Sequence, residues 1–339
     1  MILITGGTGY IGSHACIEFE KAGLKTVLVD NFSNSSSEIL NNISNILGHQ
    51  VKLYEGDIRE EVFLEKVFRE NEIDAVIHFA GCKSVSESII SPEKYYDNNV
   101  IGSLVLLKVM RKNNCKTIIF SSSATVYGQV AQSPVGEDSD LLPINPYGRS
   151  KLIVEEFLKD IYVADNRWKI AVLRYFNPVG AHISGLLGEL PSSEPQNLFP
   201  LVSQVASGIR ENIKIFGSDY QTKDGTGIRD YIHIQDLVNG HISAYKYILK
   251  NSSFEVLNLG TGQGLSVLDV ISVFERVSGK KVKYIFSDRR EGDIESSFTN
   301  PDKASKLIGW QSELGIERMC EDQWRWQNTQ KKGLLYPKE

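Results

Sequence analysis

Short apolar runs alternate with helical periodicity through the first half of the chain. Uninterrupted apolar runs are typical of strands buried on both faces of a parallel sheet, whereas apolar residues three or four positions apart are typical of amphipathic helices. Strands are expected at 2–4, 26–30, 51–58, 75–81, 116–120 and 171–176, and helices at 10–21, 59–71, 95–111 and 147–163. This alternation predicts a doubly wound, parallel α/β sheet.

The alternation breaks down after residue 176. Residues 180–228 are rich in Gly, Pro, Ser and Asn. The expected elements in the second half are helices near 198–209, from 235 onward and at 267–277, and strands at 213–216, 229–234, 256–260 and 281–286. We therefore expect a first domain at 1–176, to which residues 229–262 return, and a smaller mixed α/β domain over 177–339.

A glycine-rich loop joins the first expected strand to the first helix. Gly6, Gly9 and Gly12 let the backbone turn tightly and approach a pyrophosphate, which the helix N-terminus attracts. The second strand ends in Asp30, 18 residues after Gly12, where a carboxylate can bind the adenosine ribose and repel a 2′-phosphate. The alternative is an aspartate that caps a strand at a turn. The pattern predicts a Rossmann-type site for NAD rather than NADP.

Tyr147 and Lys151 lie one helical turn apart at the start of an expected helix, so the phenol and the ammonium share a face. To accept a proton at neutral pH, a tyrosine needs its pKa lowered by about three units from ~10, or about 4 kcal/mol. An ammonium about 4 Å away supplies that energy at an effective dielectric of about 20. An incidental surface pair is the alternative. Ser123 follows the strand at 116–120 and would face the same crevice, although hydroxyls at strand ends also form turns.

Composition and charge exclude several classes of protein. The chain has 339 residues, 41% hydrophobic and 23% charged, which is typical of a globular protein. A net charge of −5 without a basic run argues against a nucleic-acid binder. We identify no targeting signal. Every apolar run is well short of the ~20 residues that a membrane span needs, so no membrane partner is expected. The scattered cysteines predict neither a zinc site nor disulfides and favour a reducing cytoplasm; they are Cys16, Cys82, Cys115 and Cys320.

The longer motifs resemble the extended short-chain dehydrogenase/reductases, and among them the UDP-glucose 4-epimerases. The glycine loop and the Tyr-x-x-x-Lys pattern are common to the superfamily. The more specific motifs are Arg-Tyr-Phe-Asn-Pro-Val-Gly-Ala at 174–181 and Asp-Gly-Thr-Gly-Ile-Arg-Asp-Tyr-Ile-His at 224–233. The resemblance spans nearly the whole chain and implies a homodimer formed through the helices near 95–111 and 147–163.

The resemblance also implies a mechanism and a set of site residues. Tyr147 would take the proton of the sugar 4-hydroxyl as hydride passes from C4 to NAD. Lys151 would hold the nicotinamide ribose and lower the pKa of Tyr147. Ser123 would hydrogen-bond to the sugar 4-hydroxyl. The residues expected at NAD are Gly6, Gly9, Tyr10, Ile11, Gly12, Asp30, Asn31, Phe32, Ser33, Asn34, Ser35, Asp57, Ile58, Phe79, Ala80, Gly81, Lys83, Asn98, Tyr147, Lys151 and Phe176. Those expected at the UDP-hexose are Ser123, Tyr147, Asn177, Asn197, Leu198, Lys214, Ile215, Phe216, Arg229, Arg290, Asp293 and Ser297.

Some of these positions also carry an argument from their chemistry. Arg229 and Arg290 suit a diphosphate because a guanidinium pairs two oxygens at once, with surface salt bridges as the alternative. Asp57 ends the third strand and is placed to bind the adenine amino group. His78, on a continuous apolar strand, is interpreted as a core residue. No metal ligand set is expected.

One departure from the family pattern concerns the sugar. Epimerases confined to glucose and galactose resemble one another in carrying a tyrosine beside the sugar, where this chain has Ser297 within 294–298. Loss of the ring would leave room for a 2-acetamido group, so activity on UDP-N-acetylglucosamine as well as UDP-glucose is expected. The alternatives are a local shift of the alignment or another side chain in the space.

Two rival functions are disfavoured by particular residues. A nucleotide-sugar 4,6-dehydratase shares the fold, the cofactor and the first oxidation, but that family has an Asp-Glu pair where this chain has Ala124 and Thr125. A non-catalytic NAD-binding scaffold would be expected to lack the tyrosine, the lysine or the serine, and all three are present.

Overall fold

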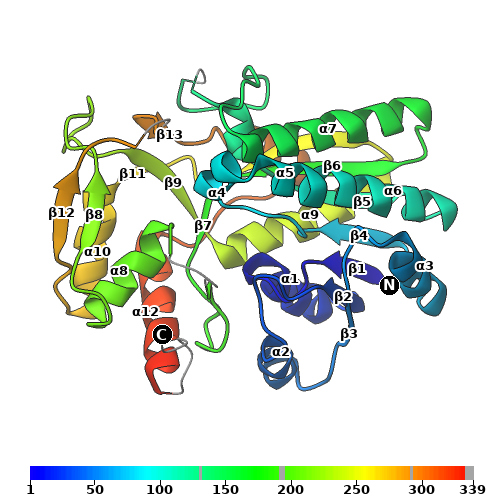
Figure 1. Cartoon of the computed structure of the whole chain (residues 1–339), viewed down its shortest axis with the longest axis horizontal. Coiled ribbons are helices and arrows are strands. Elements are labelled where there is room, and N and C mark those ends of the chain that lie inside the picture. The colour runs from blue at the N-terminus through cyan, green and yellow to red at the C-terminus, as the bar shows by residue number, and fades with distance from the viewer. Residues whose placement is uncertain (130–131, 191–194, 291–292, 333–339) are drawn as a thin grey trace.

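The computed structural model describes residues 1–129, 132–190, 195–290 and 293–332. Its larger part is a seven-stranded, parallel sheet with the strand order β10-β6-β5-β4-β1-β2-β3 (Figure 1). The strands are β1 (Ile2–Thr5), β2 (Thr26–Asp30), β3 (Lys52–Glu55), β4 (Ala75–His78), β5 (Thr117–Ser123), β6 (Lys169–Tyr175) and β10 (Phe254–Leu259). The doubly wound fold predicted from the sequence is confirmed.

Helices cover both faces of this sheet, because alternate strand residues point to opposite sides. Leu3 packs with the helices of one face, whereas Ile2 and Ile4 pack with those of the other. The face with Leu3 is covered by α3 (Glu61–Glu70), α6 (Gly102–Lys112) and α7 (Pro146–Ala164). The opposite face is covered by α1 (Tyr10–Lys21), α2 (Ile39–Leu47), α9 (Ile234–Asn251) and α11 (Asp302–Ile308).

A smaller part lies beside the end of the large sheet (Figure 1). One sheet joins β7 (Asn177–Val179), β9 (Ile228–His233), β11 (Gly264–Ser266) and β13 (Ser296–Ser297), and a second pairs β8 (Ile213–Phe216) with β12 (Tyr284–Ser287). A separate hydrophobic core lies between these strands and α8 (Leu198–Ala206), α10 (Val267–Ser278) and α12 (Ile316–Lys332).

Residues 229–262, which the sequence predicts to return to the first domain, begin with β9, which is not a strand of the large sheet although its Ile232 packs in the core of that sheet. β9 pairs with β7, β11 and β13 of the smaller part. The buried carboxylate of Asp230 explains this, since it accepts backbone hydrogen bonds from Thr261 at 2.8 Å, Gly262 at 3.0 Å and Thr299 at 3.1 Å. The chain rejoins the large sheet with α9 and then β10, which pairs with β6.

The helix expected at 95–111 is divided. Two short helices, α4 (Val85–Ile90) and α5 (Pro92–Tyr95), precede a π-helical turn at Tyr96–Ile101, after which α6 is regular. A second short turn, the 3₁₀ helix at Ala124–Tyr127, follows β5. π-Helical turns are frequent at functional sites because they redirect side chains, and this one carries Asn98 and Asn99.

Candidate active site

The glycine loop forms a cradle at the carboxyl end of β1, where the strand order of the large sheet reverses between β1 and β4. In open α/β sheets, this is where ligands bind. Gly6 has φ +68°, and a Cβ there would lie 2.8 Å from the Ala80 nitrogen. A Cβ on Gly12 would lie 2.1 Å from the Gly6 oxygen. The loop therefore accepts only glycines at these two positions and leaves room for a pyrophosphate beside the N-terminus of α1.

Asp30 ties this loop to the segment after β2. Its carboxylate is buried and accepts hydrogen bonds from the backbone of Thr8 at 3.0 Å, the backbone of Phe32 at 2.9 Å and the Ser35 hydroxyl at 3.1 Å. The carboxylate of Asp57, which follows β3, accepts from Asn31 at 2.8 Å and from Arg59, whose hydrogen bonds lower the pKa of Asp57 to about 2. The residues present fit an adenosine dinucleotide, because glycines clear the pyrophosphate path and an acidic residue ends β2.

Tyr147, Lys151 and Ser123 are brought together by α7 and β5. Asn145 caps α7 by accepting from the Gly148 backbone at 2.8 Å, and Pro146 occupies the first helical position. Tyr147 therefore lies in the first turn and is hydrogen-bonded to Ser123. The Lys151 ammonium is 6.0 Å from the centroid of the tyrosine ring. The sequence did not single out the cap that fixes where this helix begins.

The electrostatics of the pair differ from the expectation that Lys151 lowers the tyrosine pKa. Burial raises the pKa of Tyr147, and the opposing effects of the Ser123 hydrogen bond and the Lys83 charge do not offset it. The Lys151 ammonium donates instead to the Ser121 carbonyl at 2.7 Å, and burial lowers the pKa of Lys151 to about 8. The protein alone therefore keeps the phenol protonated at neutral pH, so a further positive charge is needed to make it a base.

A bridge that the sequence did not reveal crosses the crevice at Glu189. Its carboxylate accepts from the Lys83 ammonium at 2.6 Å and from the Asn197 amide at 2.9 Å. Lys83 follows β4, whereas Glu189 and Asn197 precede α8. The bridge therefore links an expected cofactor contact to an expected substrate contact.

Asn99 lies in the π-helical turn beside Asn98. Its buried amide accepts from the Cys82 backbone at 2.7 Å, donates to the Cys82 carbonyl at 3.0 Å and donates to Ser150 at 3.0 Å. It therefore joins the loop after β4 to α7. The sequence assigned Asn98 to the cofactor; Asn98 is half-buried in the same π-helical turn.

A charged cluster in the smaller part consists of Arg229, Arg290 and Asp293, and the Phe216 ring packs against it. Asp293 lies 3.9 Å from Arg229 and 3.4 Å from Arg290, measured between side-chain oxygen and nitrogen. The Arg290 guanidinium stacks 4.2 Å from the centroid of the Phe216 ring. Two guanidiniums on one half-exposed surface suit a diphosphate. Ser297 pairs with Arg229 across β13 and β9 and is half-buried there.

Three apolar residues expected at the site, Ile58, Ile215 and Phe176, are largely enclosed by other side chains. Ile58 lies in the core of the large sheet and Ile215 in the core of the smaller part, at 5% and 2% exposed. Phe176, at 7%, packs beside the 3₁₀ turn. Each can offer a ligand little more than its backbone, because these side chains fill the interior.

The remaining expected residues lie at the ends of elements. Tyr10 and Ile11 open α1, and the Tyr10 hydroxyl donates to the Gly180 carbonyl at 2.7 Å. The others sit at these places: Gly9 at the N-terminal end of α1, Ser33 and Asn34 exposed after β2, Phe79 and Gly81 after β4, Asn177 exposed at the start of β7, Leu198 at the start of α8, and Lys214 exposed on β8.

His78 is a core residue, as predicted. Both ring nitrogens are hydrogen-bonded, to Thr5 at 2.7 Å and Ser103 at 2.9 Å, and burial lowers the pKa of His78 to about 3. The four cysteines are free thiols. Within the described ranges no cluster of His, Cys, Asp and Glu could hold a metal ion, and no helix there has the length and apolarity to cross a membrane.

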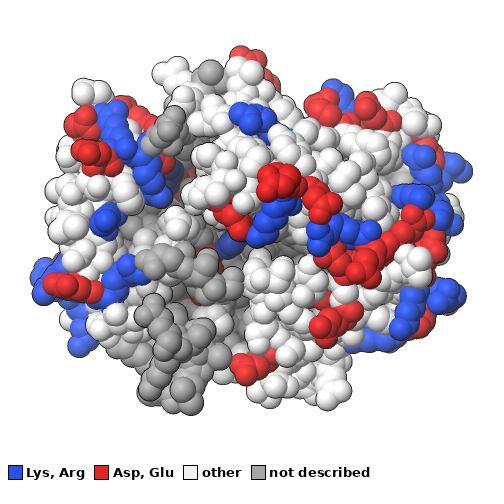
Figure 2. Space-filling model, viewed as in Figure 1, with Lys and Arg blue, Asp and Glu red and all other residues white. Residues whose placement is uncertain are grey.

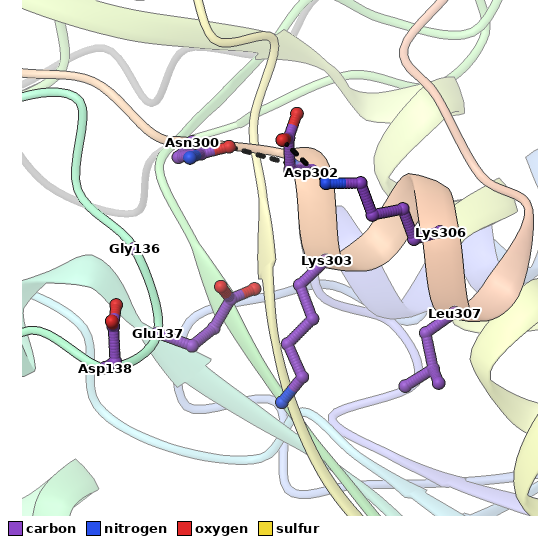
Figure 3. Close-up of a pocket in the computed structure, with 8 residues that line it drawn as sticks. All are labelled: Gly136, Glu137, Asp138, Asn300, Asp302, Lys303, Lys306 and Leu307. Carbon is purple, nitrogen blue, oxygen red and sulfur yellow. Dashed lines mark hydrogen bonds and ion pairs between the residues drawn. The ribbon is translucent and has the colours of Figure 1, made fainter.

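A surface pocket of about 450 Å³ is lined by none of the residues expected at the cofactor or the substrate (Figure 3). Its lining residues are Gly136, Glu137, Asp138, Asn300, Asp302, Lys303, Lys306 and Leu307. The Lys303 ammonium donates to the Val256 carbonyl at 2.8 Å, and Lys306 pairs with Asp302 at 3.0 Å. These lysines are therefore engaged within the protein. Figure 2 shows acidic and basic side chains interspersed on the face in view, as expected from the modest net charge.

Comparison with known proteins gives consistent matches. The family model for GDP-mannose 4,6 dehydratase matches residues 3–323. The UDP-glucose 4-epimerase of Bacillus subtilis (strain 168) is 52% identical over 332 residues, which cover 98% of each chain.

Solved structures show the same relationship. UDP-glucose 4-epimerase from Stenotrophomonas maltophila, with bound NAD and formylated UDP-arabinopyranose, is 44% identical with a TM-score of 0.96, covering 98% of this chain and 99% of that one. The UDP-Glc/GlcNAc 4-epimerase of Campylobacter jejuni is 37% identical with a TM-score of 0.84, covering 97% and 99%. The chain thus belongs to the UDP-glucose 4-epimerases, within the extended short-chain dehydrogenase/reductases.

Proposed function

We propose that the protein interconverts UDP-glucose and UDP-galactose by reversible epimerisation at C4, with tightly bound NAD as its cofactor. The observation that carries this proposal is the grouping of Tyr147, Ser123 and Lys151 beside the glycine cradle of Gly6 and Gly12. A dinucleotide in the cradle and a sugar against Tyr147 would meet in one crevice. The epimerases to which the chain is similar support the same reaction.

The protein's own groups manage the proton and the position of the sugar. NAD supplies the acceptor and donor for the hydride of C4. Tyr147 takes the proton of the 4-hydroxyl and later returns it, and Ser123 orients that hydroxyl through the hydrogen bond it shares with the phenol. The 4-keto sugar turns in the site before it receives the hydride on its other face. Burial keeps the phenol of Tyr147 protonated. The ammoniums of Lys151 and Lys83 therefore ionise it only when a cation is bound as well.

The UDP portion is held by the charged cluster of the smaller part. Arg229 and Arg290 would bind the diphosphate, and Asn197 and Phe216 would contact the rest of the nucleotide sugar. In this assignment the large sheet carries the cofactor and the smaller part carries the substrate. Strong anchoring at the diphosphate lets the hexose remain free to turn, since its contacts need not fix one face.

The dehydratase named by the family model requires an additional acid and base. At the positions in question the structure has Ala124 and Thr125 in the 3₁₀ turn, and the Thr125 hydroxyl donates to Ser123 at 3.0 Å. Neither side chain can eliminate water from a sugar. Ala124 and Thr125 therefore favour epimerisation over dehydration.

The direct test is to incubate purified protein with UDP-glucose and no added reductant. We expect UDP-galactose to form up to an equilibrium mixture, and the same mixture to be reached from UDP-galactose. A product that has lost water would show a dehydratase, and an unchanged substrate would show a scaffold. Either outcome contradicts the proposal.

We further propose that the sugar site accepts UDP-N-acetylglucosamine, because Ser297 replaces a bulky ring beside Arg229. The Campylobacter jejuni neighbour is described as a UDP-Glc/GlcNAc 4-epimerase. Ser297→Tyr should lower kcat/KM for the acetylated substrate by about 10²-fold, the scale of steric discrimination in a pocket, while UDP-glucose turnover changes by less than about threefold. A substrate panel measured by NMR decides this.

Ser296→Tyr is the matched control for that variant. Neighbouring strand residues point to opposite faces, so a tyrosine at Ser296 leaves the sugar side of β13 unchanged. Its ratio of the two activities should equal that of the unmutated protein. Unimpaired turnover of the acetylated sugar by Ser297→Tyr would rule out a gatekeeping role for this position.

We base a proposal for assembly and location on the same family relationship. We propose a cytoplasmic homodimer formed through α6 and α7; on the outer surface of α7, Ile153 is 43% exposed and Val163 is 78% exposed. Analytical ultracentrifugation of the purified protein tests the dimer, and a monomer at micromolar concentration would contradict it.

A further inference from the structure

Arg174 and Glu155 form a buried ion pair next to β5. The last three residues of β5, Ser121–Ser123, are called the serine run below and directly precede the 3₁₀ turn. The Arg174 guanidinium contacts both oxygens of Glu155, with Nη2 2.6 Å from Oε2 and Nε 3.1 Å from Oε1. Each side chain is only 4% exposed. A buried pair of this kind gains little stability over apolar side chains of the same volume, because both ions lose their hydration. Stability alone is therefore a poor account of its presence.

Glu155 belongs to the same helical face as the reacting groups. It lies one turn after Lys151 and two turns after Tyr147 on α7. The Ser122 hydroxyl donates a hydrogen bond to its carboxylate. Ser122 stands between Ser121, whose carbonyl accepts from Lys151, and Ser123, which is bonded to Tyr147. The carboxylate thus joins α7 to β5 at the centre of the catalytic contacts.

Arg174 extends this connection to two further elements. Its Nη1 donates to the Tyr127 hydroxyl at 3.0 Å, and that hydroxyl donates to the Asn258 carbonyl oxygen at 2.6 Å. Arg174 lies on β6, Tyr127 in the 3₁₀ turn and Asn258 on β10. All three are buried. The pair therefore fixes α7, β5, β6 and β10 relative to one another.

The chain of contacts continues to the strand that carries Ser297. The Asn258 amide donates to the Val135 carbonyl at 3.0 Å, and the Val135 backbone donates to the Phe298 carbonyl at 2.8 Å. Phe298 directly follows Ser297. The same buried network therefore reaches from the proton-transfer groups to the expected sugar side of the smaller part.

We propose that Glu155, Arg174 and Ser122 are positioning residues, which hold Tyr147 and Lys151 in register with Ser123 and Ser121 for proton transfer. They touch no reacting atom and act through the groups they align. The inference rests on the proposed epimerase function. It differs from a purely structural role in one respect: the loss of the network must lower kcat even where the fold keeps its stability.

Two sets of variants separate these roles. Ser122→Ala removes the hydrogen bond that connects the pair to the serine run. Glu155→Leu combined with Arg174→Met replaces the pair by apolar groups, which often preserves stability. Ser203→Ala is the control, because Ser203 is likewise a buried serine, bonded to the Pro200 carbonyl at 2.9 Å, in α8 of the smaller part. For each protein, kcat, KM for UDP-glucose, bound NAD and Tm are measured.

We expect Ser122→Ala and the double variant to lose about 10- to 10²-fold in kcat, the effect of a displacement near 1 Å at reacting groups. KM should stay within about threefold, because the diphosphate anchors are remote. The control should keep its kcat. Unchanged kcat in Ser122→Ala would overturn the proposal, and so would unchanged kcat in a double variant with normal Tm. If the double variant does not fold, the kcat of Ser122→Ala alone decides. An inactive unmutated protein would instead refute the proposed function.

Discussion

Replacing Tyr147 with phenylalanine is expected to lower kcat by about 10³-fold, within the range for loss of a general acid–base group. The ring is retained, so its edge-to-face contact with Tyr95, 6.4 Å between centroids, is preserved and the fold should not change. Only the hydroxyl that shares a hydrogen bond with Ser123 disappears. Steady-state assays with UDP-glucose should show KM changed by less than about threefold and bound NAD unchanged.

Tyr95→Phe provides the control for this variant. Tyr95 also loses one hydroxyl, which donates to Glu87 at 2.8 Å, and it packs against the same ring without contacting the proposed reacting atoms. We expect its kcat to stay close to that of the unmutated protein. Equal activities of the two variants would show that Tyr147 is not the base.

Replacing Lys151 with methionine is expected to reduce activity and raise stability at the same time. The ammonium is buried, and burial lowers the pKa of Lys151 from 10.5 to about 8. At pH values where the lysine is charged in both the folded and the unfolded protein, this shift lowers the free energy of unfolding by about 3 kcal/mol. Allowing for the lost hydrogen bond to Ser121, we expect the free energy of unfolding at pH 7 to rise by about 1–3 kcal/mol. Loss of the charged donor should lower kcat by about 10²–10³-fold.

The pH dependence gives this prediction a definite sign. Below pH 8 the lysine is charged in both the folded and the unfolded state, so the whole advantage of methionine is present. Between pH 8 and 10.5 the folded lysine loses its proton first, so the advantage declines and is gone above 10.5. Urea unfolding of both NAD-free proteins at pH 7 and pH 10 measures it. A destabilised Lys151→Met protein at pH 7 would contradict this account of the buried charge.

The parts of the structure predicted from the sequence are those coded by neighbouring residues. The apolar runs define the strands, because a strand covered on both faces cannot alternate with polar residues. The glycine loop with Asp30 and the Tyr147–Lys151 spacing are equally local patterns. They sufficed for the fold, which the structure confirms, and for a candidate site, whose residue roles stay predictions.

The parts that could not be predicted depend on contacts between distant segments. Lys83 and Glu189 are 106 residues apart, and Tyr127 and Asn258 are 131 apart. No spacing rule connects such pairs. The placement of β9 in the smaller part follows from hydrogen bonds of Asp230 to residues 31 and 69 positions away. The raised pKa of Tyr147 depends on burial, which a residue pattern does not specify.

The central claim is that the hydrogen of C4 leaves the sugar and returns to it within one site while Tyr147 carries the hydroxyl proton. The most direct measurement uses UDP-glucose deuterated at C4, incubated in ordinary water with the unmutated protein. NMR of the UDP-galactose formed should show deuterium retained at C4 with no exchange from solvent. Ordinary hydrogen at C4 of the product would contradict the account.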